Sequence, residues 1–580
     1  MDVSRPAGAW CQERLRRSHS TSGWDIPDNA MNSSEARSWD SLRENRSRRL
    51  ERAASAGIGR EVPCDRIIEL LEAVMQPGDR VCIEGNNQKQ ADFLAESLAA
   101  CDPARLHDLS LVQSVLALPS HLDLFERGLA SRLDFSFSGP QGARLARLVN
   151  EKRIRIGAIH TYLELYGRYF LDLTPNVALI AAQAVDARGN LYLGPNAEET
   201  PTIVEATAFK AGVVIAQVNE RRETLPRVDV PADWVDFTVR APRPNFIEPL
   251  FTRDPAQITE VQVLMAMMAI KGIYAEYGVT RLNHGIGFDT AAIELLLPTY
   301  AAELGLKGRI CTHWALNPHP TLIPAIESGF VHSIHSFGSE VGMEAYVAAR
   351  PDVFFTGPDG SMRSNRAFCQ TAGLYACDMF IGSTLQMDLA GNSSTATLGR
   401  ITGFGGAPNM GSDPHGRRHA SPAWLKAGRE AGGANATRGR KLVVQMVETF
   451  REHMAPVFVE ELDAWKLQKA MGAELPPIMI HGDDVSHVVT EEGIANLLLC
   501  RTPEEREQAI RGVAGYTPAG MARDKAAVEN LRDRGVIRRV EDLGIDPRDA
   551  TRDLLAARSV KDLVRWSGGL YSPPSRFRNW

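Results

Sequence analysis

The alternation of two sequence patterns, interrupted once, is the feature that most constrains the fold of this chain. Short β-branched runs alternate with amphipathic helical patterns from Arg60 onward, stop in a proline-rich stretch at 239–259, and then resume. This alternation is typical of parallel strands connected by helices. Because 580 residues exceed what one ordinary core holds, we predict an α/β protein with two domains of mainly parallel sheet. We place these domains at 41–240 and 260–545, joined by a linker at 241–259.

The composition excludes several classes of protein. The net charge is −6 and basic residues cluster only locally, so nothing in the charge favours binding to nucleic acid or to an anionic membrane. No apolar run is long enough to span a bilayer. The eight cysteines form no C-x-x-C motif, which indicates reduced thiols in the cytoplasm rather than disulfides or a zinc site. We expect 1–40 to be a poorly ordered extension and 546–580 to be a C-terminal tail.

Periodicity places individual elements in both halves. In the first half we expect a strand at 80–84, a polar turn and a helix ending at Ala100, with further strands at 153–159, 177–185, 191–194 and 211–219. In the second half we expect helices at 258–277 and 291–304, a turn at 281–290, and strands at 308–316, 352–357, 379–389 and 441–447. Ligands bind beyond the carboxyl ends of strands in open parallel sheets. The loops at 84–90, 283–290 and 401–418 are therefore the leading candidates for a site.

The segment ITGFGGAPNMGSDPHGRRHAS, at 401–421, is unusually rich in glycine. Gly403 and Gly405 match the first two glycines of the dinucleotide fingerprint, but Pro408 stands where the third is required. No P-loop motif occurs anywhere in the chain. The backbone N–H groups of such a loop are suited to an oxyanion or a carboxylate. A solvated connection between two elements explains the same composition.

Other chemistries lack the spacing that they require. His313, His319, His332 and His335 are close in sequence but match no metal-ligand motif. No serine occupies a nucleophile elbow, and several cysteines lie in or beside apolar runs, unlike a catalytic thiol. We therefore predict no metal site, and a pocket built from loops, polar amides and backbone groups.

One polar stretch of the second half fits such a pocket closely. Asn283 and His284 precede the Gly-x-Gly turn at 285–287. Asp289 or Thr290 is expected to cap the helix that follows, so that the first helical N–H groups point at a bound anion or carbonyl oxygen. A cap or turn that satisfies only its own backbone is the simpler explanation of the stretch when it is taken alone.

A second polar stretch follows another predicted strand of the same half. Asn317 and His319 flank Pro318 in THWALNPHP. The same local explanation applies to this turn when it is taken alone. Three polar loops at predicted strand ends in one half nevertheless indicate that they share a pocket.

Several long segments resemble the family of biotin-independent malonate decarboxylase alpha subunits. The resemblance extends from about residue 40 to the C-terminal region, and the segments that carry it are CIEGNNQKQADFL, NLYLGPNAEETPTIVEATAF, RLNHGIGFDTAAIELLLPTY, ICTHWALNPHPTLIPAIESGF, TGPDGSMRSNRAFCQTAGLYACDMFIGSTLQ and GNSSTATLGRITGFGGAPNMGSDPHGRRHASPAWLKAG. More distantly, VVTEEGIANL resembles a stretch of acetyl-CoA hydrolase/transferase proteins. The resemblance implies a fold similar to that of the CoA transferases, with the active site at the interface of two α/β domains.

The same resemblance implies an activity and its partners. It implies a transferase that exchanges acetate for malonate on the thiol of an acyl carrier protein subunit, while separate subunits decarboxylate malonyl-carrier to acetyl-carrier. The thiol is of phosphopantetheine type, derived from dephospho-CoA, and belongs to the carrier. No cofactor bound to this chain is therefore expected.

One departure from the CoA transferases affects the expected mechanism. Many of them use a glutamate after the strand that follows the Gly-x-Gly turn to accept the acyl group, whereas the corresponding stretch CTHWALNPHP has no carboxylate. A covalent glutamyl thioester is therefore not expected, and the citrate lyase alpha subunit is the better analogy. We expect a malonate carboxylate to attack the acetyl thioester directly, which requires positioning and oxyanion stabilisation but no protein nucleophile.

This scheme assigns residues to two groups. Catalytic groups are expected at Asn283, His284, Gly285, Gly287, Gly403, Gly405, Gly406 and Asn409. Contacts to the substrate or to the pantetheine arm are expected at Glu84, Asn86, Asn87, Gln88, Asn196, Asn317 and His319. The second carboxylate of malonate requires a cation, preferably an arginine, and the sequence does not rank the candidates Arg281, Arg366, Arg400 and Arg417.

Two other functions remain open at this point. The first is a CoA transferase that acts on free acyl-CoA and a small carboxylic acid. The second is a non-catalytic subunit that only assembles the carrier and decarboxylase components. The sequence also leaves open the oligomeric state and the surface on which the carrier docks.

Overall fold

The computed structural model describes residues 38–86, 89–336, 338–357, 366–578 and 580. The expected disorder of 1–40 therefore lies mostly outside the described residues, and helix α2 (Ser38–Ser55) begins just before the expected boundary. The chain from Arg46 onward forms one compact unit. In the part of the chain that the structure describes, no helix has both the length and the apolar character needed to cross a membrane.

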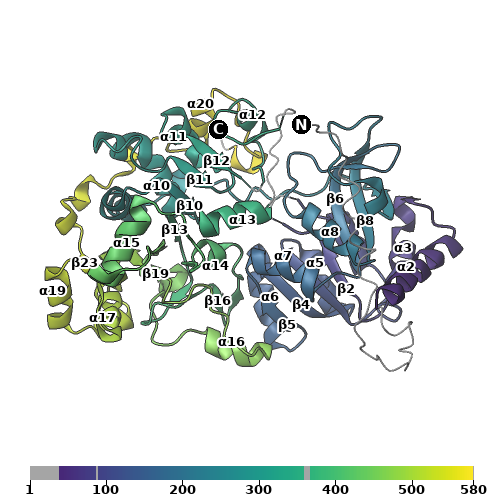
Figure 1. Ribbon diagram of the computed structural model, residues 1–580, viewed down its shortest axis with the longest axis horizontal. Helices are drawn as coiled ribbons and strands as arrows, with labels where there is room; N and C mark the ends of the chain where they lie inside the picture. Colours follow the sequence, from purple (N-terminus) through teal and green to yellow (C-terminus); the bar gives the residue numbers. More distant parts are fainter. Residues whose placement is uncertain (1–37, 87–88, 337, 358–365, 579) are drawn as a thin grey trace, which may run out of the picture. The chain divides into compact units, whose positions relative to one another are not determined.

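A nine-stranded sheet organises the first half of this unit (Figure 1). Its strands, in spatial order, are β1 (Glu61–Val62), β9 (Phe237–Arg240), β8 (Val213–Arg221), β6 (Val177–Val185), β2 (Arg80–Ile83), β3 (Leu109–Val115), β4 (Ala130–Phe137) and β5 (Arg155–Ile159). These strands run parallel, and only β7 (Leu191–Tyr192) pairs antiparallel, with β6. Apolar runs such as that of β6 suit a sheet buried on both faces.

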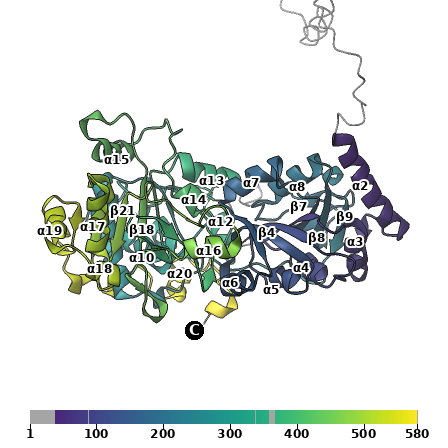
Figure 2. The same cartoon turned by 90° about the horizontal axis from the view of Figure 1, so that it is seen from below.

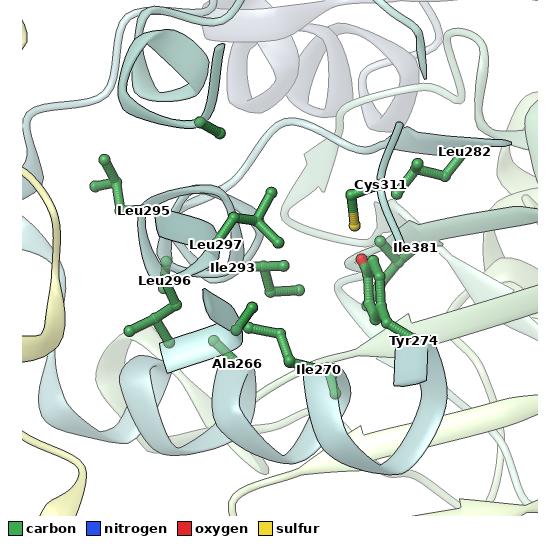
Figure 3. Packing of buried hydrophobic residues seen from close by; sticks show 14 of the residues in the cluster. Ala266, Ile270, Tyr274, Leu282, Ile293, Leu295, Leu296, Leu297, Cys311 and Ile381 are labelled. Carbon is green, nitrogen blue, oxygen red and sulfur yellow. The ribbon is translucent and has the colours of Figure 1, made fainter. Parts of the chain in front are cut away.

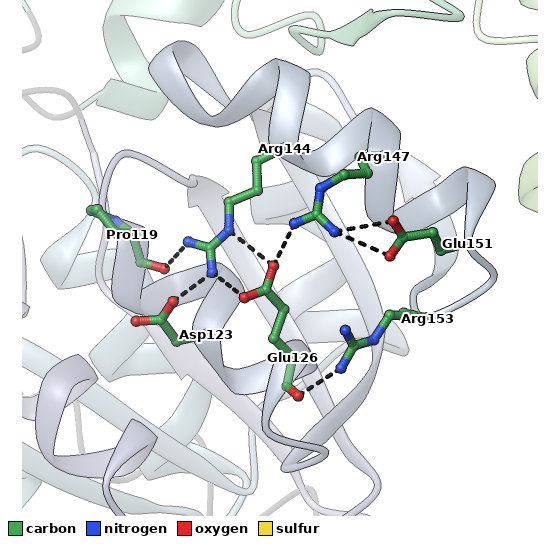
Figure 4. A network of polar contacts seen from close by, with 7 residues as sticks. All are labelled: Pro119, Asp123, Glu126, Arg144, Arg147, Glu151 and Arg153. Atoms are coloured by element: carbon green, nitrogen blue, oxygen red, sulfur yellow. Dashed lines mark hydrogen bonds and ion pairs between the residues drawn. The ribbon is translucent and has the colours of Figure 1, made fainter.

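Helices cover this sheet and connect its strands (Figure 2). They are α3 (Ile67–Val74), α4 (Asp92–Ala99), α5 (Pro119–Glu126), α6 (Gly142–Asn150), α7 (Tyr162–Leu171) and α8 (Thr200–Phe209). An ion-pair network joins α5 to α6: Arg144 and Arg147 both bind Glu126, at 2.6 and 2.7 Å (Figure 4). Their hydrogen bonds lower the pKa of Glu126 to about 2 although burial opposes this.

A second sheet of eight strands organises the other half. Its order is β12 (Ser333–His335), β11 (His313–Ala315), β10 (Arg281–His284), β13 (Met379–Gly382), β18 (Leu442–Met446), β21 (His487–Thr490), β22 (Gly493–Asn496) and β23 (Ile537–Arg538). Strands β12 to β21 are parallel, and the last two are added antiparallel. The α/β class with mainly parallel sheets is thereby confirmed.

The core of the second half lies between this sheet and its helices α9 (Glu260–Ala269) and α10 (Phe288–Leu296). Ala266 and Ile270 pack with Ile293 and Leu296, as Figure 3 shows. Both helices continue as π-helical turns, at Ile270–Ala275 and Leu297–Ala301.

The segment expected as a C-terminal tail belongs to the same core. Leu563, in helix α20 (Val560–Trp566), and Tyr571 are buried in it. The described part of this segment up to residue 578 therefore belongs to the folded second half and is not an appendage to it.

Two expected elements of the second half are wrong. Arg281–His284 was expected within a turn but forms strand β10, which lies between β11 and β13 with Leu282, Asn283 and His284 buried. Residues 352–357 form no strand and contribute isolated bridge residues, among them Phe354, which pairs with Ile334. The cap of α10 also differs: Gly287 is the N-cap, and the Thr290 hydroxyl bonds back to the carbonyl of Gly285 at 2.7 Å.

Candidate functional site

A cavity of about 360 Å³ lies where strands of both sheets end. Three neighbouring parallel strands of the second sheet supply one wall: Gly285 follows β10, Asn317 follows β11, and Ser383 follows β13. The position agrees with the rule that parallel sheets bind ligands beyond the carboxyl ends of their strands.

The first half supplies the opposite wall. Phe137 ends β4 and Tyr162 begins α7, and both line the cavity. The glycine-rich loop of the second half crosses to this wall, where Phe404 and Gly405 donate their N–H groups to the Ser136 carbonyl at 2.6 and 2.9 Å. The stretches 283–286 and 403–407, far apart in sequence, therefore share one cavity.

The backbone N–H groups of the glycine-rich loop are not all available. Gly405 uses its N–H for Ser136, and Gly285 uses its own for the Ile381 carbonyl at 2.7 Å. Within the described residues, the N–H groups of Gly403 and Gly406 have no hydrogen-bond partner, and both residues line the cavity. The expected set of backbone donors is thus corrected to these two.

A buried carboxylate joins two histidines of the cavity wall. Glu294, on α10, contacts Nδ1 of His284 and Nδ1 of His319 with the same Oε1 atom, each at 2.9 Å, and the Thr321 hydroxyl donates to its other oxygen. The Tyr274 hydroxyl lies 2.8 Å from Nε2 of His284. Both nitrogens of His284 are therefore occupied within the protein.

His319, unlike His284, has one ring nitrogen that is not bound within the described protein. Nδ1 of His319 is held by Glu294, whereas its Nε2 has no hydrogen-bond partner among the residues that the structure describes. The ring lines the cavity and stacks on Phe251, with centroids 5.3 Å apart. His319 is thus the imidazole of this pair that can donate to or accept from a ligand.

The charges of this group follow from its burial. Burial alone raises the pKa of Glu294, but His319 and His284 outweigh it and lower the pKa to about 2, so the carboxylate is ionised at pH 7. Burial lowers the pKa of His284, although Glu294 opposes the shift, so that this imidazole is neutral. A neutral His284 that donates from Nδ1 to Glu294 accepts at Nε2 from Tyr274.

This shift predicts how stability depends on pH. Glu294 has a folded-state pKa near 2 and an ordinary value of 4.5, so its ionisation stabilises the folded state above pH 4.5 by on the order of 3 kcal/mol. This contribution declines as the pH falls from 4.5 towards 2. We expect the Tm difference between the wild type and Glu294→Gln to narrow below pH 4.5, as measured by scanning calorimetry. A difference that stays constant down to the lowest pH at which both proteins fold would contradict this assignment.

Other predicted residues lie near the cavity without lining it. Gly287 caps α10. Asn409, in helix α14 (Ala407–Met410), is buried and donates to Gln370, which does line the cavity. Their expected contact with substrate is corrected to a supporting position.

The predicted residues of the first half are placed elsewhere. Glu84 is buried in its own half, where it accepts from the Ala181 N–H at 2.8 Å and pairs with Lys89 at 3.2 Å. Asn86 is buried beside it and accepts from the Lys89 N–H at 2.7 Å. Asn196 accepts from the N–H of Ser339. None of these three lines the cavity, and Asn87 and Gln88 lie outside the described residues.

The structure separates the four arginine candidates. Arg366, at the start of α13 (Arg366–Tyr375), is fully buried in an ion pair with Glu198, and Arg417 is buried in one with Asp378 at 2.6 Å. Arg281 lies 3.6 Å from the same aspartate and outside the cavity. Counter-ions thus occupy Arg366 and Arg417, and of the four candidates only Arg400 lines the cavity.

Sequence reasoning missed some lining residues. Arg253 comes from the segment expected to be a linker, and Gln370 comes from α13. Ser383 follows the observed strand β13, but the predicted strand ran on to residue 389, so the strand-end rule did not point to Ser383. No sequence signal distinguishes Arg253 from other arginines in proline-rich segments. In the described part of the chain, no three His, Cys, Asp or Glu side chains are grouped so that they could hold a metal ion.

Comparison with known proteins identifies close relatives. Residues 38–580 match the family model described as "Malonate decarboxylase, alpha subunit, transporter". A curated protein of Malonomonas rubra, named acetyl-S-ACP:malonate ACP transferase, is 60% identical over 548 residues, which are 93% of this chain and 99% of that protein.

Solved structures extend the comparison. The chain is 59% identical to a chain of a Pseudomonas malonate decarboxylase hetero-tetramer crystallised with malonate, covering 93% of this chain and 99% of that one, with a TM-score of 0.91. The alpha subunit of a Streptococcus mutans citrate lyase, described as putative and solved with citrate, is 14% identical with a TM-score of 0.56, covering 89% of this chain and 86% of that one. The second likeness concerns the fold alone.

Proposed function

The chain belongs to the family of malonate decarboxylase alpha subunits, and from this we propose that it is a transferase that exchanges acetyl for malonyl on the thiol of an acyl carrier protein. The observation that carries the proposal is the cavity shared by 283–286 and 403–407, in a chain that aligns over nearly its whole length with a transferase of this kind. Its volume is within the range of small-molecule sites, about 300–1,000 Å³.

The proposed reaction has two steps that balance without a protein nucleophile. A carboxylate oxygen of malonate attacks the acetyl thioester, which gives a mixed anhydride and the carrier thiolate. The thiolate then attacks the malonyl carbonyl, and acetate leaves. Holding the two reactants together can supply about 7–11 kcal/mol of the barrier.

The lining of the cavity supports this noncovalent scheme. Among the described residues that line it there is no Asp, Glu, Cys or Lys. The Gly403 and Gly406 N–H groups are then the donors for the negative charge that develops on the tetrahedral oxygens. Nε2 of His319 joins them when that ring carries both protons, because Nδ1 donates to Glu294. Each such donor is worth about 3–4 kcal/mol. His284, whose nitrogens are both occupied, positions the group and does not transfer protons to substrate.

The proposal includes the partners of the reaction. The carrier subunit supplies the phosphopantetheine-type thiol, derived from dephospho-CoA, and decarboxylase subunits consume malonyl-carrier. Malonate enters and acetate leaves at this chain. A cytoplasmic location, expected from the cysteine pattern, belongs to the same proposal.

One experiment tests the transfer itself. Purified chain is incubated with acetylated carrier and [14C]malonate, without decarboxylase subunits, and label on the carrier and free acetate are measured. We expect stoichiometric formation of malonyl-carrier and acetate. Failure to transfer label would favour an assembly role, and an equal or higher kcat/KM with free acetyl-CoA as donor would favour a CoA transferase.

The absence of a glutamyl intermediate has its own test. Enzyme incubated with acetylated carrier is treated with borohydride, digested and analysed by mass spectrometry. We expect no reduced glutamate at Glu294, Glu327 or Glu340, because none of them lines the cavity. Reduction at any of these positions would overturn the noncovalent scheme.

A further inference from the structure

Arg253 is held in the cavity wall by the segment that joins the two halves. Glu340 accepts from both the backbone N–H and the hydroxyl of Thr252, at 3.0 and 2.9 Å, and the same hydroxyl lies 3.2 Å from that of Tyr571. The Nη1 atom of Arg253 donates to the carbonyls of Leu250 and Thr252, at 2.6 and 3.1 Å. These contacts hold the guanidinium of Arg253 through its Nη1 atom.

The rest of this guanidinium has no partner in the described protein. Its Nε and Nη2 atoms make no hydrogen bond, and no carboxylate of the described residues lies within ion-pair distance of it. Burial lowers the pKa of Arg253, with Glu340 and Glu294 opposing the shift from further away. The centre of the guanidinium lies 5.8 Å from the Phe288 ring centroid. A partly desolvated cation without a counter-ion is costly unless a ligand supplies one.

Arg253 differs in this respect from the other arginines considered. Arg281, Arg366 and Arg417 each face an aspartate or glutamate of the protein. Arg400 lines the cavity but is exposed to solvent, where water screens its charge. Arg253 is therefore the half-buried guanidinium of the cavity that leaves two adjacent N–H donors for a carboxylate, the geometry that binds one bidentately.

We propose that Arg253 is the specificity-determining residue of this site and binds, through Nε and Nη2, the malonate carboxylate that does not react. The inference rests on the proposed transferase function. It assigns the choice between a dicarboxylic and a monocarboxylic acceptor to one side chain of the joining segment. The reacting carboxylate lies at the Gly403 and Gly406 donors and does not contact Arg253.

Two reactions on the same variant test the assignment. The first is transfer of malonate to acetylated carrier. The second is exchange of [14C]acetate into acetylated carrier, which repeats the same thioester chemistry with an acceptor that has no second carboxylate. In Arg253→Met we expect kcat/KM for malonate to fall about 100-fold, the effect typical of losing a desolvated charge pair, while acetate exchange stays within about threefold of wild type. Arg253→Lys keeps the positive charge but loses the two parallel N–H donors, so its kcat/KM for malonate should lie between those of wild type and Arg253→Met.

The ratio of the two rates does not depend on the folded fraction, so partial unfolding of a variant does not obscure it. Arg60→Met is the matched control, because Arg60 also donates to backbone carbonyls but lies in the first half away from the cavity; its ratio should equal that of wild type. Equal losses of malonate transfer and acetate exchange in Arg253→Met, or no loss of either, would overturn the proposal. A larger change of the ratio in Arg400→Met would assign the subsite to Arg400. A wild-type protein that performs neither reaction would refute the proposed function instead.

Discussion

Replacing Glu294 by glutamine is expected to lower turnover about 100-fold, the effect of losing one oxyanion donor. Its Oε1 atom accepts from Nδ1 of both His284 and His319. A glutamine amide can accept at one oxygen but presents N–H donors on its other side, where the Thr321 hydroxyl also donates. Because Tyr274 fixes the tautomer of His284, His319 is the ring that turns or changes tautomer. Steady-state assays of malonate transfer at saturating substrate measure the effect as kcat.

Glu327→Gln provides the control for this variant. Glu327 accepts from the Tyr346 hydroxyl at 2.7 Å and also pairs with Arg350, but it does not line the cavity. We expect its kcat to remain close to that of wild type. If Glu294→Gln kept full turnover while its Tm fell, the carboxylate would serve stability alone and His319 would not act as a donor.

Replacing Gly403 by alanine is expected to cost activity and stability together. Its φ of +79° is one that side chains rarely adopt, and an added Cβ would overlap the Ser136 carbonyl and lie 3.0 Å from Phe137 Cα. The strain and the overlap together should lower the free energy of unfolding by about 3 kcal/mol or more. The loop must also withdraw from β4, which displaces the N–H groups of Gly403 and Gly406. Turnover and Tm measured on the same preparation check both effects.

Gly399→Ala separates this effect from a general intolerance of the loop. Gly399 lies in the turn between β16 (Ala396–Thr397) and β17 (Arg400–Ile401), its φ is not in the left-handed region, and an added Cβ would meet no atom within 4 Å. We expect wild-type turnover and Tm for this variant. A Gly403→Ala protein that behaved like Gly399→Ala would show that the contact with β4 is not needed for the site.

The strand-end rule explains how much of this site the sequence could predict. Strong apolar periodicity located β2, β6, β8 and β18 to within about two residues. Because the strands are parallel, the polar residues that follow them lie at one edge of each sheet. This reasoning singled out Asn283, Asn317 and Gly403, and the structure brings them to one cavity, although Asn283 lies in strand β10 and not in a loop.

The same reasoning could not predict how charges pair across the sequence. In the sequence, Arg366 and Arg417 were as good candidates for binding malonate as Arg400. The fold pairs them with Glu198 and Asp378. Such counter-ions are more than 35 residues away in sequence, so that no local pattern reveals them. Arg253 was hidden for the opposite reason, because it lies in a proline-rich segment whose composition suggests only a connection.

The crossing of the glycine-rich loop has a consequence for how this protein can be divided. The loop is encoded with the second half, yet Phe404 and Gly405 bond to Ser136 and Tyr162 bonds to the Gly405 carbonyl. A fragment that contains only one of the two sheets would carry only part of the wall of the cavity. If the chain is divided near the joining segment and the two halves are expressed separately, we expect each half to be inactive alone. Transfer should return only when the two halves associate. The affinity of the halves for each other would then set the protein concentration at which activity is recovered.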